Sequence, residues 1–346
     1  MASLPFKMVC LDLDGTLLQP DHTVSEFTRT ILQKLVALGV HVVIATGRPY
    51  ADVRHVTETI RFNALLGNTD HSGVCYTITS NGARIYNDKG RIIVRKNIPE
   101  TFCRVLYGLE KDDNEVNVNV FRDVVRHNSP PKMERMNTKD NACDNNSVLL
   151  EDENEVFLTL NNAENVECEE EWVCRHPAVE EAKLYEKSNF CYRVEQHLEL
   201  NYPTDNVSEI FFLCYNFQKA MELERRIDML NSEFERQIRE ESDKHDIGSA
   251  GIVVAPSAAH CLDIVPKNTS KGIAVQDVAR RLGLTMNDVI AFGDGLNDVS
   301  MLSIVKKGCV MLNANPRLKE MLPHLEIVGS NSEDGVAKKL QEIFCL

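Results

Sequence analysis

The sequence predicts an α/β protein: a Rossmann-like three-layer core, in which helices cover a mostly parallel sheet, with an inserted α+β domain. Apolar stretches typical of buried strands alternate with amphipathic helices near both ends of the chain. The middle of the chain instead carries hairpin signals and one long amphipathic helix. A length of 346 residues is enough for two domains. We therefore place the core at residues 1–84 and 266–346, and the inserted cap-like domain at residues 85–265.

The first part of the core is predicted to run strand, helix, strand, helix, strand. Three mostly apolar stretches have the composition of buried parallel strands: Lys7–Leu13, Val40–Ala45 and Val74–Thr79. Thr23 and Glu26 have the spacing of a capping box and predict the start of the first helix, and Gly39 is placed to end it. The second helix is expected to follow Pro49.

The inserted domain is predicted to begin and end with hairpins. The first hairpin joins Ala83–Tyr86 to Arg91–Val94, and the second joins Gly251–Val254 to Cys261–Val265. A strand is expected at Glu209–Tyr215, and apolar spacing then predicts a long helix.

Other parts of the inserted domain are expected to have structural roles rather than functional ones. The segment Met133–Ser147 lacks apolar periodicity and is predicted to be a mobile, acidic and asparagine-rich surface insertion. We expect the acidic run Glu167–Glu171 to be solvated, and Trp172 and Phe211-Phe212 to pack inside the domain.

The second part of the core returns to alternating helices and strands. A helix is expected from Ser270 to about Gly283, and another near Asn297. Strands are predicted at Val289–Phe292, Cys309–Leu312 and Glu326–Val328, before a last helix.

The composition excludes several kinds of partner. The formal net charge of −14 disfavours binding to nucleic acid or to an anionic membrane surface. Eleven cysteines without regular spacing indicate reduced thiols, and no apolar run reaches the ~18–20 residues that span a bilayer. We therefore expect a cytoplasmic protein, and by default a monomer. An acidic protein can still bind a small phosphorylated metabolite where its site is locally positive or holds a metal.

Acidic residues follow two of the predicted core strands. Asp12 and Asp14 lie at the end of the first strand, and Asp294 and Asp298 follow Val289–Phe292. Ligands bind at this edge of open α/β sheets, and oxygen ligands in this number suit Mg²⁺. A simple Asp-Gly turn is the alternative for Asp14, but it leaves Asp12 unexplained.

Anion-binding groups are expected at the same edge. Thr46, Gly47 and Arg48 follow the second strand and offer a hydroxyl, an unhindered N–H and a guanidinium. Lys271 opens a helix, where an ammonium opposes the helix dipole unless both bind one anion. Each segment alone has a plain alternative, namely a strand end for Thr-Gly and a solvated side chain for the lysine.

The order of four motifs, DLDGTLL, ATGR, SKG and GDGLND, resembles the haloacid dehalogenase-like (HAD) superfamily, and within it the Cof-like capped phosphatases. The resemblance implies that Asp12 is the nucleophile that forms an aspartyl-phosphate and that Asp14 is the general acid and base. It implies that Asp12, the Asp14 carbonyl and Asp294 hold Mg²⁺ with support from Asp298. The residues implied to contact the phosphoryl group are Thr46, Gly47, Lys271 and Asn297, with Arg48 either joining them or serving the structure.

The function implied is a phosphoric monoester hydrolase that acts on sugar phosphates, nucleotides or cofactor phosphates. A phosphomutase that uses the same aspartyl-phosphate is one alternative, and a non-catalytic phosphosugar-binding protein is another. A dinucleotide-dependent oxidoreductase is disfavoured, because Asp294 and Asp298 would repel a pyrophosphate.

Overall fold

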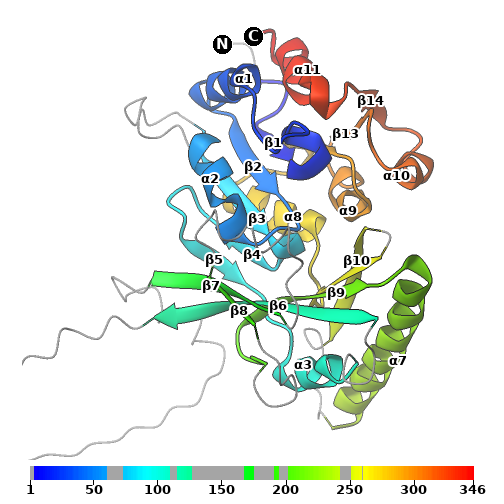
Figure 1. The fold of residues 1–346 in the computed structure, drawn as a ribbon. Helices are drawn as coiled ribbons and strands as arrows, with labels where there is room; N and C mark the ends of the chain where they lie inside the picture. The colour runs from blue at the N-terminus through cyan, green and yellow to red at the C-terminus, as the bar shows by residue number, and fades with distance from the viewer. Residues whose placement is uncertain are drawn as a thin grey trace, which may run out of the picture.

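The computed structural model describes residues 4–60, 73–109, 115–126, 167–174, 191–194, 202–241, 251–258 and 260–346. These residues form a sheet of eight strands and a sheet of six, which lie one above the other in Figure 1. The predicted insertion Met133–Ser147 lies outside the described residues.

The first sheet is mostly parallel and contains strands from both ends of the chain. Its strand order is β14 (Glu326–Val328), β13 (Lys307–Met311), β12 (Val289–Gly293), β1 (Met8–Leu11), β2 (His41–Ala45), β3 (Cys75–Thr79), β4 (Arg84–Tyr86) and β5 (Ile92–Arg95). The pairs from β14 to β3 are parallel, and β4 and β5 add an antiparallel edge. Every residue of β1 and β12 is buried, as their apolar composition predicts.

Helices flank this sheet in two groups. The first group is α1 (Glu26–Ala37), α2 (Tyr50–Ile60) and α11 (Gly335–Phe344), and the second contains α8 (Lys271–Arg281) and the short α9 (Val299–Leu302), with α10 (Pro316–Met321) after β13. Right-handed crossovers between parallel strands place helices on both faces of such a sheet. The predicted mostly parallel α/β core is therefore confirmed.

The start of α1 differs from the prediction. The helix begins at Glu26 and Ser25 is its N-cap, with the Ser25 hydroxyl 3.0 Å from the Thr28 N–H that it accepts. Thr23 instead donates its N–H and its hydroxyl to the carboxylate of Asp21, at 3.0 and 2.7 Å. This local turn uses the donors of Thr23, so the predicted cap at Thr23 is wrong and the N-cap lies two residues later, at Ser25.

The second sheet is antiparallel apart from one edge pair. Its order is β10 (Ile252–Ala258), β11 (Cys261–Pro266), β9 (Val207–Cys214), β6 (Val116–Arg126), β7 (Glu167–Cys174) and β8 (Cys191–Val194), of which β7 and β8 are parallel. One face packs on α3 (Glu100–Tyr107) and α7 (Phe217–Glu241) through a core that includes Phe102, Phe212 and Ile227. In Figure 1 these two helices lie on the side of the sheet away from the first sheet.

The two predicted hairpins belong to different sheets. β10 and β11 pair within the second sheet, whereas β4 pairs with β3 and β5 pairs with β4, so this hairpin continues the first sheet. Residue 85, the predicted start of the inserted domain, therefore lies inside β4 of the first sheet. The chain passes to the second sheet only after Arg95 and returns after Pro266. Among the described residues, no helix has both the length and the apolar character to cross a membrane.

Arg84 joins the two sheets at the place where the chain passes between them. Its guanidinium is fully buried and lies 2.9 Å from the carboxylate of Asp123 on β6. It also donates to the backbone carbonyls of Lys96 and Asn206, at 2.5 and 3.0 Å. One buried cation thus satisfies acceptors from both domains.

Replacing Arg84 by methionine should destabilise the protein by about 3–5 kcal/mol, because it leaves the Asp123 carboxylate and the two carbonyls buried without their main donor. Urea unfolding followed by circular dichroism measures this loss. The double variant Arg84→Met/Asp123→Leu should recover part of it, since no charge is then left behind. Arg91→Met, on the exposed turn of the same hairpin, is the control, and equal stability of Arg84→Met and Arg91→Met would contradict the role given to Arg84.

Candidate functional site

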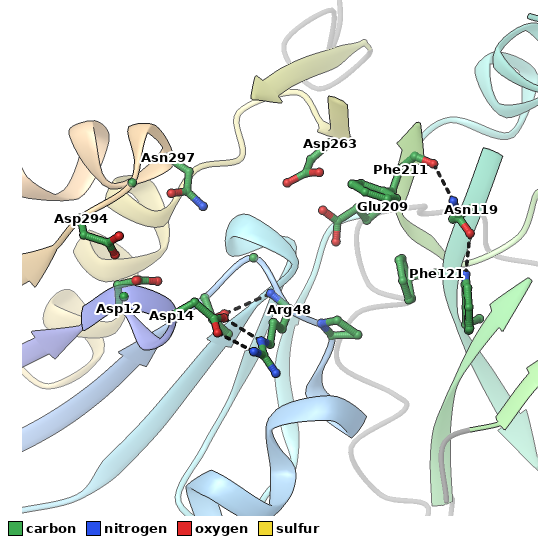
Figure 2. Close-up of a pocket in the computed structure, with 16 residues that line it drawn as sticks. Asp12, Asp14, Arg48, Asn119, Phe121, Glu209, Phe211, Asp263, Asp294 and Asn297 are labelled. Atoms are coloured by element: carbon green, nitrogen blue, oxygen red, sulfur yellow. Dashed lines mark hydrogen bonds and ion pairs between the residues drawn. The ribbon is translucent and has the colours of Figure 1, made fainter. Parts of the chain in front are cut away.

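The candidate site lies at the carboxyl ends of β1, β2 and β12. β1 stands between the other two in the sheet, and all three are parallel, so their ends meet at one edge. Asp12 and Asp14 follow β1, Thr46 to Arg48 follow β2, and Asp294 follows β12. Figure 2 shows these segments converging on one cavity.

Three carboxylates gather there, close enough together that they could hold a metal ion. One oxygen each from Asp12, Asp294 and Asp298 lies within 4.8 Å of the other two. Asp12 and Asp298 are 6% and 0% exposed. The Thr16 hydroxyl fixes Asp294 by donating to its Oδ1 at 2.8 Å, and the N–H groups of Asp294 and Gly295 both donate to Oδ2 of Asp298 at 2.9 Å.

Lys271 forms ion pairs with two of these carboxylates. Its ammonium is buried and lies 2.7 Å from an oxygen of Asp12 and 2.7 Å from an oxygen of Asp298. Burial by itself lowers the pKa of Lys271, but the two carboxylates outweigh that effect and raise its pKa above the usual value. The family resemblance implies that Lys271 contacts the phosphoryl group, whereas in the structure its direct contacts are these two carboxylates.

The cluster carries more negative charge than Lys271 neutralises. Burial, together with the carboxylate of Asp298, raises the pKa of Asp12 well above its usual range, and burial also raises the pKa of Asp294. A divalent cation between the three carboxylates would remove this cost. Carboxylate oxygens close to a cavity that can also admit water and phosphate are the donor set that Mg²⁺ takes, so the residues present fit that ion.

Gly15 allows the turn after β1 to approach Asp294. It has φ = +74°, and a Cβ at this position would stand 2.3 Å from Oδ2 of Asp294. Any other residue would therefore strain the backbone and push Asp294 out of the cluster. The Asp-Gly pair does form a turn, as the simpler alternative proposed, and this turn is also what brings Asp12 and Asp294 together.

Asp14 points away from the three carboxylates and toward Arg48. The Arg48 guanidinium binds both oxygens of Asp14, at 2.6 and 2.5 Å, and donates to the buried Asp52 at 3.0 Å. His22 is also close, with Nδ1 3.5 Å from Asp14. Arg48 therefore orients the Asp14 carboxylate at the edge of the cavity (Figure 2).

Asn81 connects the core site to the second sheet. Its Oδ1 accepts from Nδ2 of Asn297 at 3.0 Å, and its own Nδ2 lies 3.2 Å from Asp263 and 3.4 Å from Glu209. Asn81 and the preceding Ser80 both have positive φ, 52° and 46°, which non-glycine residues rarely adopt. Such strain is often kept at functional sites. Asn81 was not predicted as a site residue, although the stretch Thr79–Ala83 that contains it fits the Cof-like pattern and follows a predicted strand.

The site opens into a cavity of about 500 Å³ between the two sheets. From the first sheet it is lined by Asp12, Asp14, Gly15, Thr46, Gly47, Arg48, Pro49, Asp294, Gly295 and Asn297. From the second it is lined by Asn119, Phe121, Trp172, Glu209, Phe211 and Asp263. The first group contains most of the predicted site residues. Trp172 and Phe211, which were expected only to pack inside the inserted domain, also line the cavity.

Glu170 forms a second contact between the domains. One of its oxygens accepts from the Ala51 N–H in the first turn of α2 at 2.7 Å, and the other accepts from the Tyr86 hydroxyl at 3.0 Å. Burial, and then the nearby carboxylate of Asp123, raise the pKa of Glu170 to about 7. The prediction that the whole Glu167–Glu171 run is solvated is therefore wrong at Glu170, because this side chain faces the first sheet.

Comparison with known proteins identifies the family. The family model of haloacid dehalogenase-like hydrolases matches residues 9–170 and 149–340. The chain therefore belongs to the haloacid dehalogenase-like hydrolases, as the four motifs predict, and it is an enzyme of that superfamily.

Relatives of similar length are named as phosphatases. A Haemophilus influenzae protein provisionally named a phosphatase is 28% identical over 344 residues, which cover 99% of both chains. An HMP-PP phosphatase of Cronobacter sakazakii is 28% identical over 335 residues, 96% of this chain and 94% of the other. Among solved structures, a haloacid dehalogenase-like hydrolase from Bacteroides thetaiotaomicron superposes with a TM-score of 0.64 at 21% identity, covering 98% and 100% of the two chains.

The raised pKa of Glu170 predicts a pH-dependent stability. The folded protein binds a proton at Glu170 with a pKa of about 7, and the unfolded chain does so only near the usual 4.5. The stabilisation is thus complete below pH 4.5 and is lost as the pH rises through about 7, on the order of 3 kcal/mol in all. Glu170→Gln keeps an amide in place of the neutral acid, so it should match the wild type at pH 5 and exceed it at pH 8 in urea unfolding.

The exposed Glu233→Gln on α7 is the control, because it removes the same charge without burial. Parallel stability profiles for wild type and Glu170→Gln across this pH range would contradict the titration assigned to Glu170.

Proposed function

We propose that this enzyme is a Mg²⁺-dependent phosphatase that hydrolyses small phosphomonoesters through an aspartyl-phosphate on Asp12. The observation that carries the proposal is the position of two different carboxylates at one cavity: Asp12 in the cluster with Asp294 and Asp298, and Asp14 beside it on Arg48. The phosphatase names of full-length relatives support the same reaction class.

Asp12 is the nucleophile in this proposal. Its carboxylate oxygen attacks phosphorus, the bond from phosphorus to the leaving oxygen breaks, and the phosphoryl group is then carried on Asp12. Lys271 fixes the direction of Asp12 by binding one of its oxygens. A bound Mg²⁺, held by Asp12, Asp294 and Asp298 with the Asp14 carbonyl, would supply charge neutralisation for the phosphoryl oxygens.

Asp14 transfers protons in both steps. In its protonated form it gives a proton to the departing alcohol oxygen, and as a carboxylate it takes a proton from the water that attacks the aspartyl-phosphate and releases inorganic phosphate. The Arg48 guanidinium binds both Asp14 oxygens, so it has to release one of them before that oxygen can give a proton to the leaving group. We infer that Arg48 is a positioning residue for Asp14.

The phosphoryl oxygens are bound by groups that line the cavity: the Thr46 hydroxyl, the Gly47 N–H and the Asn297 amide. A Cβ at position 47 would stand 3.2 Å from Asn81, so glycine leaves this wall open. The partner is a small phosphorylated metabolite, which the HMP-PP phosphatase relatives support. A monomeric state and a cytoplasmic location stay predictions from the sequence.

Activity should require Mg²⁺, because Asp12 and Asp294 would otherwise repel a phosphate dianion. Phosphate release from a panel of phosphomonoesters, measured with Mg²⁺ and again in excess chelator, tests both the reaction and the metal. Activity should disappear with chelator and return with added Mg²⁺. Full turnover in chelator would rule out the metal assignment, and no turnover of any ester with Mg²⁺ would rule out the phosphatase.

The two N-terminal acids should respond differently to amide substitution. Asp12→Asn should lose turnover of every ester by about 10⁴-fold or more, as removal of a nucleophile does. Asp14→Asn should slow the first step by about 10²–10⁴-fold for a sugar phosphate, whose alkoxide leaves poorly, but much less for a nitrophenyl phosphate.

The first-turnover burst of released alcohol or phenol is the quantity to measure, since Asp14 also acts in the second step. Equal burst losses for both esters would mean that Asp14 acts only by orienting its neighbours.

A further inference from the structure

The wall of the cavity opposite the three carboxylates is one face of the second sheet. In strand register, Phe211 on β9 pairs with Asp263 on β11 and with Asn119 on β6. Two residues along, Phe121 pairs with Glu209 on β9 and with Trp172 on β7. Side chains two residues apart on a strand share a face, so these two rows present all six side chains to the cavity together.

The acidic members of this wall lie close together. Glu209 and Asp263 are 3% and 5% exposed, and both lie within hydrogen-bond distance of the same Asn81 nitrogen. Figure 2 shows the two carboxylates between the core residues Asn297 and Arg48 on one side and Phe211 on the other. Burial and the carboxylate of Asp263 raise the pKa of Glu209 well above its usual range. A leaving group that extends from the phosphoryl position into the cavity would therefore meet the oxygen acceptors of two carboxyl groups beside the negative charge of Asp263.

Three of the four remaining members of the wall are aromatic, and the fourth is Asn119. The rings of Phe121 and Trp172 are stacked, with centroids 6.4 Å apart and planes inclined by 14°, and Phe211 lies in the neighbouring row. Asn119 holds the Trp172 indole by accepting from its Nε1 at 3.1 Å. The wall thus combines rigid apolar surface with two acidic acceptors.

We propose that Glu209 and Asp263 determine substrate specificity by selecting leaving groups that present hydrogen-bond donors, either hydroxyls or a cationic nitrogen, and by rejecting leaving groups that carry a second anion. The inference rests on the proposed function, because it concerns the alcohol part of the same ester. A donor satisfies the buried carboxylates, whereas a further phosphate or carboxylate would add like charge in a region with little water.

This selection bears on the phosphomutase alternative. A mutase has to retain a bisphosphate while it turns over in the cavity, so its second phosphate would approach the Glu209 and Asp263 side of the wall. Two acidic side chains there oppose such an intermediate. The wall therefore favours release of a neutral or cationic alcohol.

A series of para-substituted benzyl phosphates tests the proposal, because the methylene insulates the leaving oxygen from the substituent. The four substituents are aminomethyl, hydroxymethyl, methyl and carboxymethyl, which present a cation, a neutral donor, no donor and an anion. For the wild type with Mg²⁺, kcat/KM should be about tenfold higher for the better of the two donor esters than for methyl, and about tenfold lower for carboxymethyl. Comparing kcat/KM for the aminomethyl and hydroxymethyl compounds shows whether the wall prefers a cationic donor or a hydroxyl.

Variants that remove the two acidic groups should reduce the differences in kcat/KM among the four benzyl phosphates. In Glu209→Gln/Asp263→Asn, kcat/KM for the carboxymethyl ester should rise about tenfold relative to the methyl ester, and the advantage of the aminomethyl ester should fall. Asp228→Asn, an exposed acid on α7 of the same domain, is the matched control and should keep the wild-type ranking.

The outcomes separate the two proposals. If the wild type hydrolyses none of these esters and none of the wider panel, the proposed function fails. If it hydrolyses the methyl and carboxymethyl esters with equal kcat/KM, the specificity role of Glu209 and Asp263 is overturned while the phosphatase stands. The wild-type series decides this alone if the double variant does not fold.

Discussion

The site depends on one buried ion-pair network: the Lys271 ammonium held between Asp12 and Asp298. Three carboxylates at the end of a buried sheet would repel one another, and the lysine both reduces this repulsion and fixes the orientation of two of them. The lysine comes from the first turn of α8, the aspartates from loops after β1 and β12. Pairing these groups therefore requires the two distant parts of the chain to complete one sheet.

The second domain is held on this core by polar contacts that are buried on both sides. Arg84 donates hydrogen bonds to Asp123 and to backbone carbonyls of the segments that connect the two sheets. Glu170 accepts a hydrogen bond from the first turn of α2. Buried polar contacts of this kind are directional, so they fix how the domains face each other more narrowly than apolar packing alone. The cavity therefore has a defined shape, with chemistry on one wall and aromatic and acidic residues on the other.

The sequence predicted the parts of the site that are local. Asp12, Thr46 and Asp294 each follow an apolar stretch, so strand ends in a parallel sheet are enough to bring them together. Glu209, Asp263 and Asn81 were not predicted, because their meeting depends on register in the antiparallel sheet and on how that sheet faces the core. Glu170 was misassigned for the same reason. An acidic run has the composition of a solvated surface, and the sequence does not show that Glu170 packs against α2 of the core.

The division of the cavity between two sheets has a consequence for how such an enzyme can diversify. The groups assigned to bond making and breaking all stand on loops of one sheet, and the groups that meet the alcohol stand on the face of another. Substitutions on that face can accumulate without disturbing the carboxylates around Lys271. Asn81 is the exception, since its two amide atoms contact Asn297 on one side and Glu209 and Asp263 on the other. Related enzymes that act on other substrates are thus expected to differ more often on this sheet face than at Asn81.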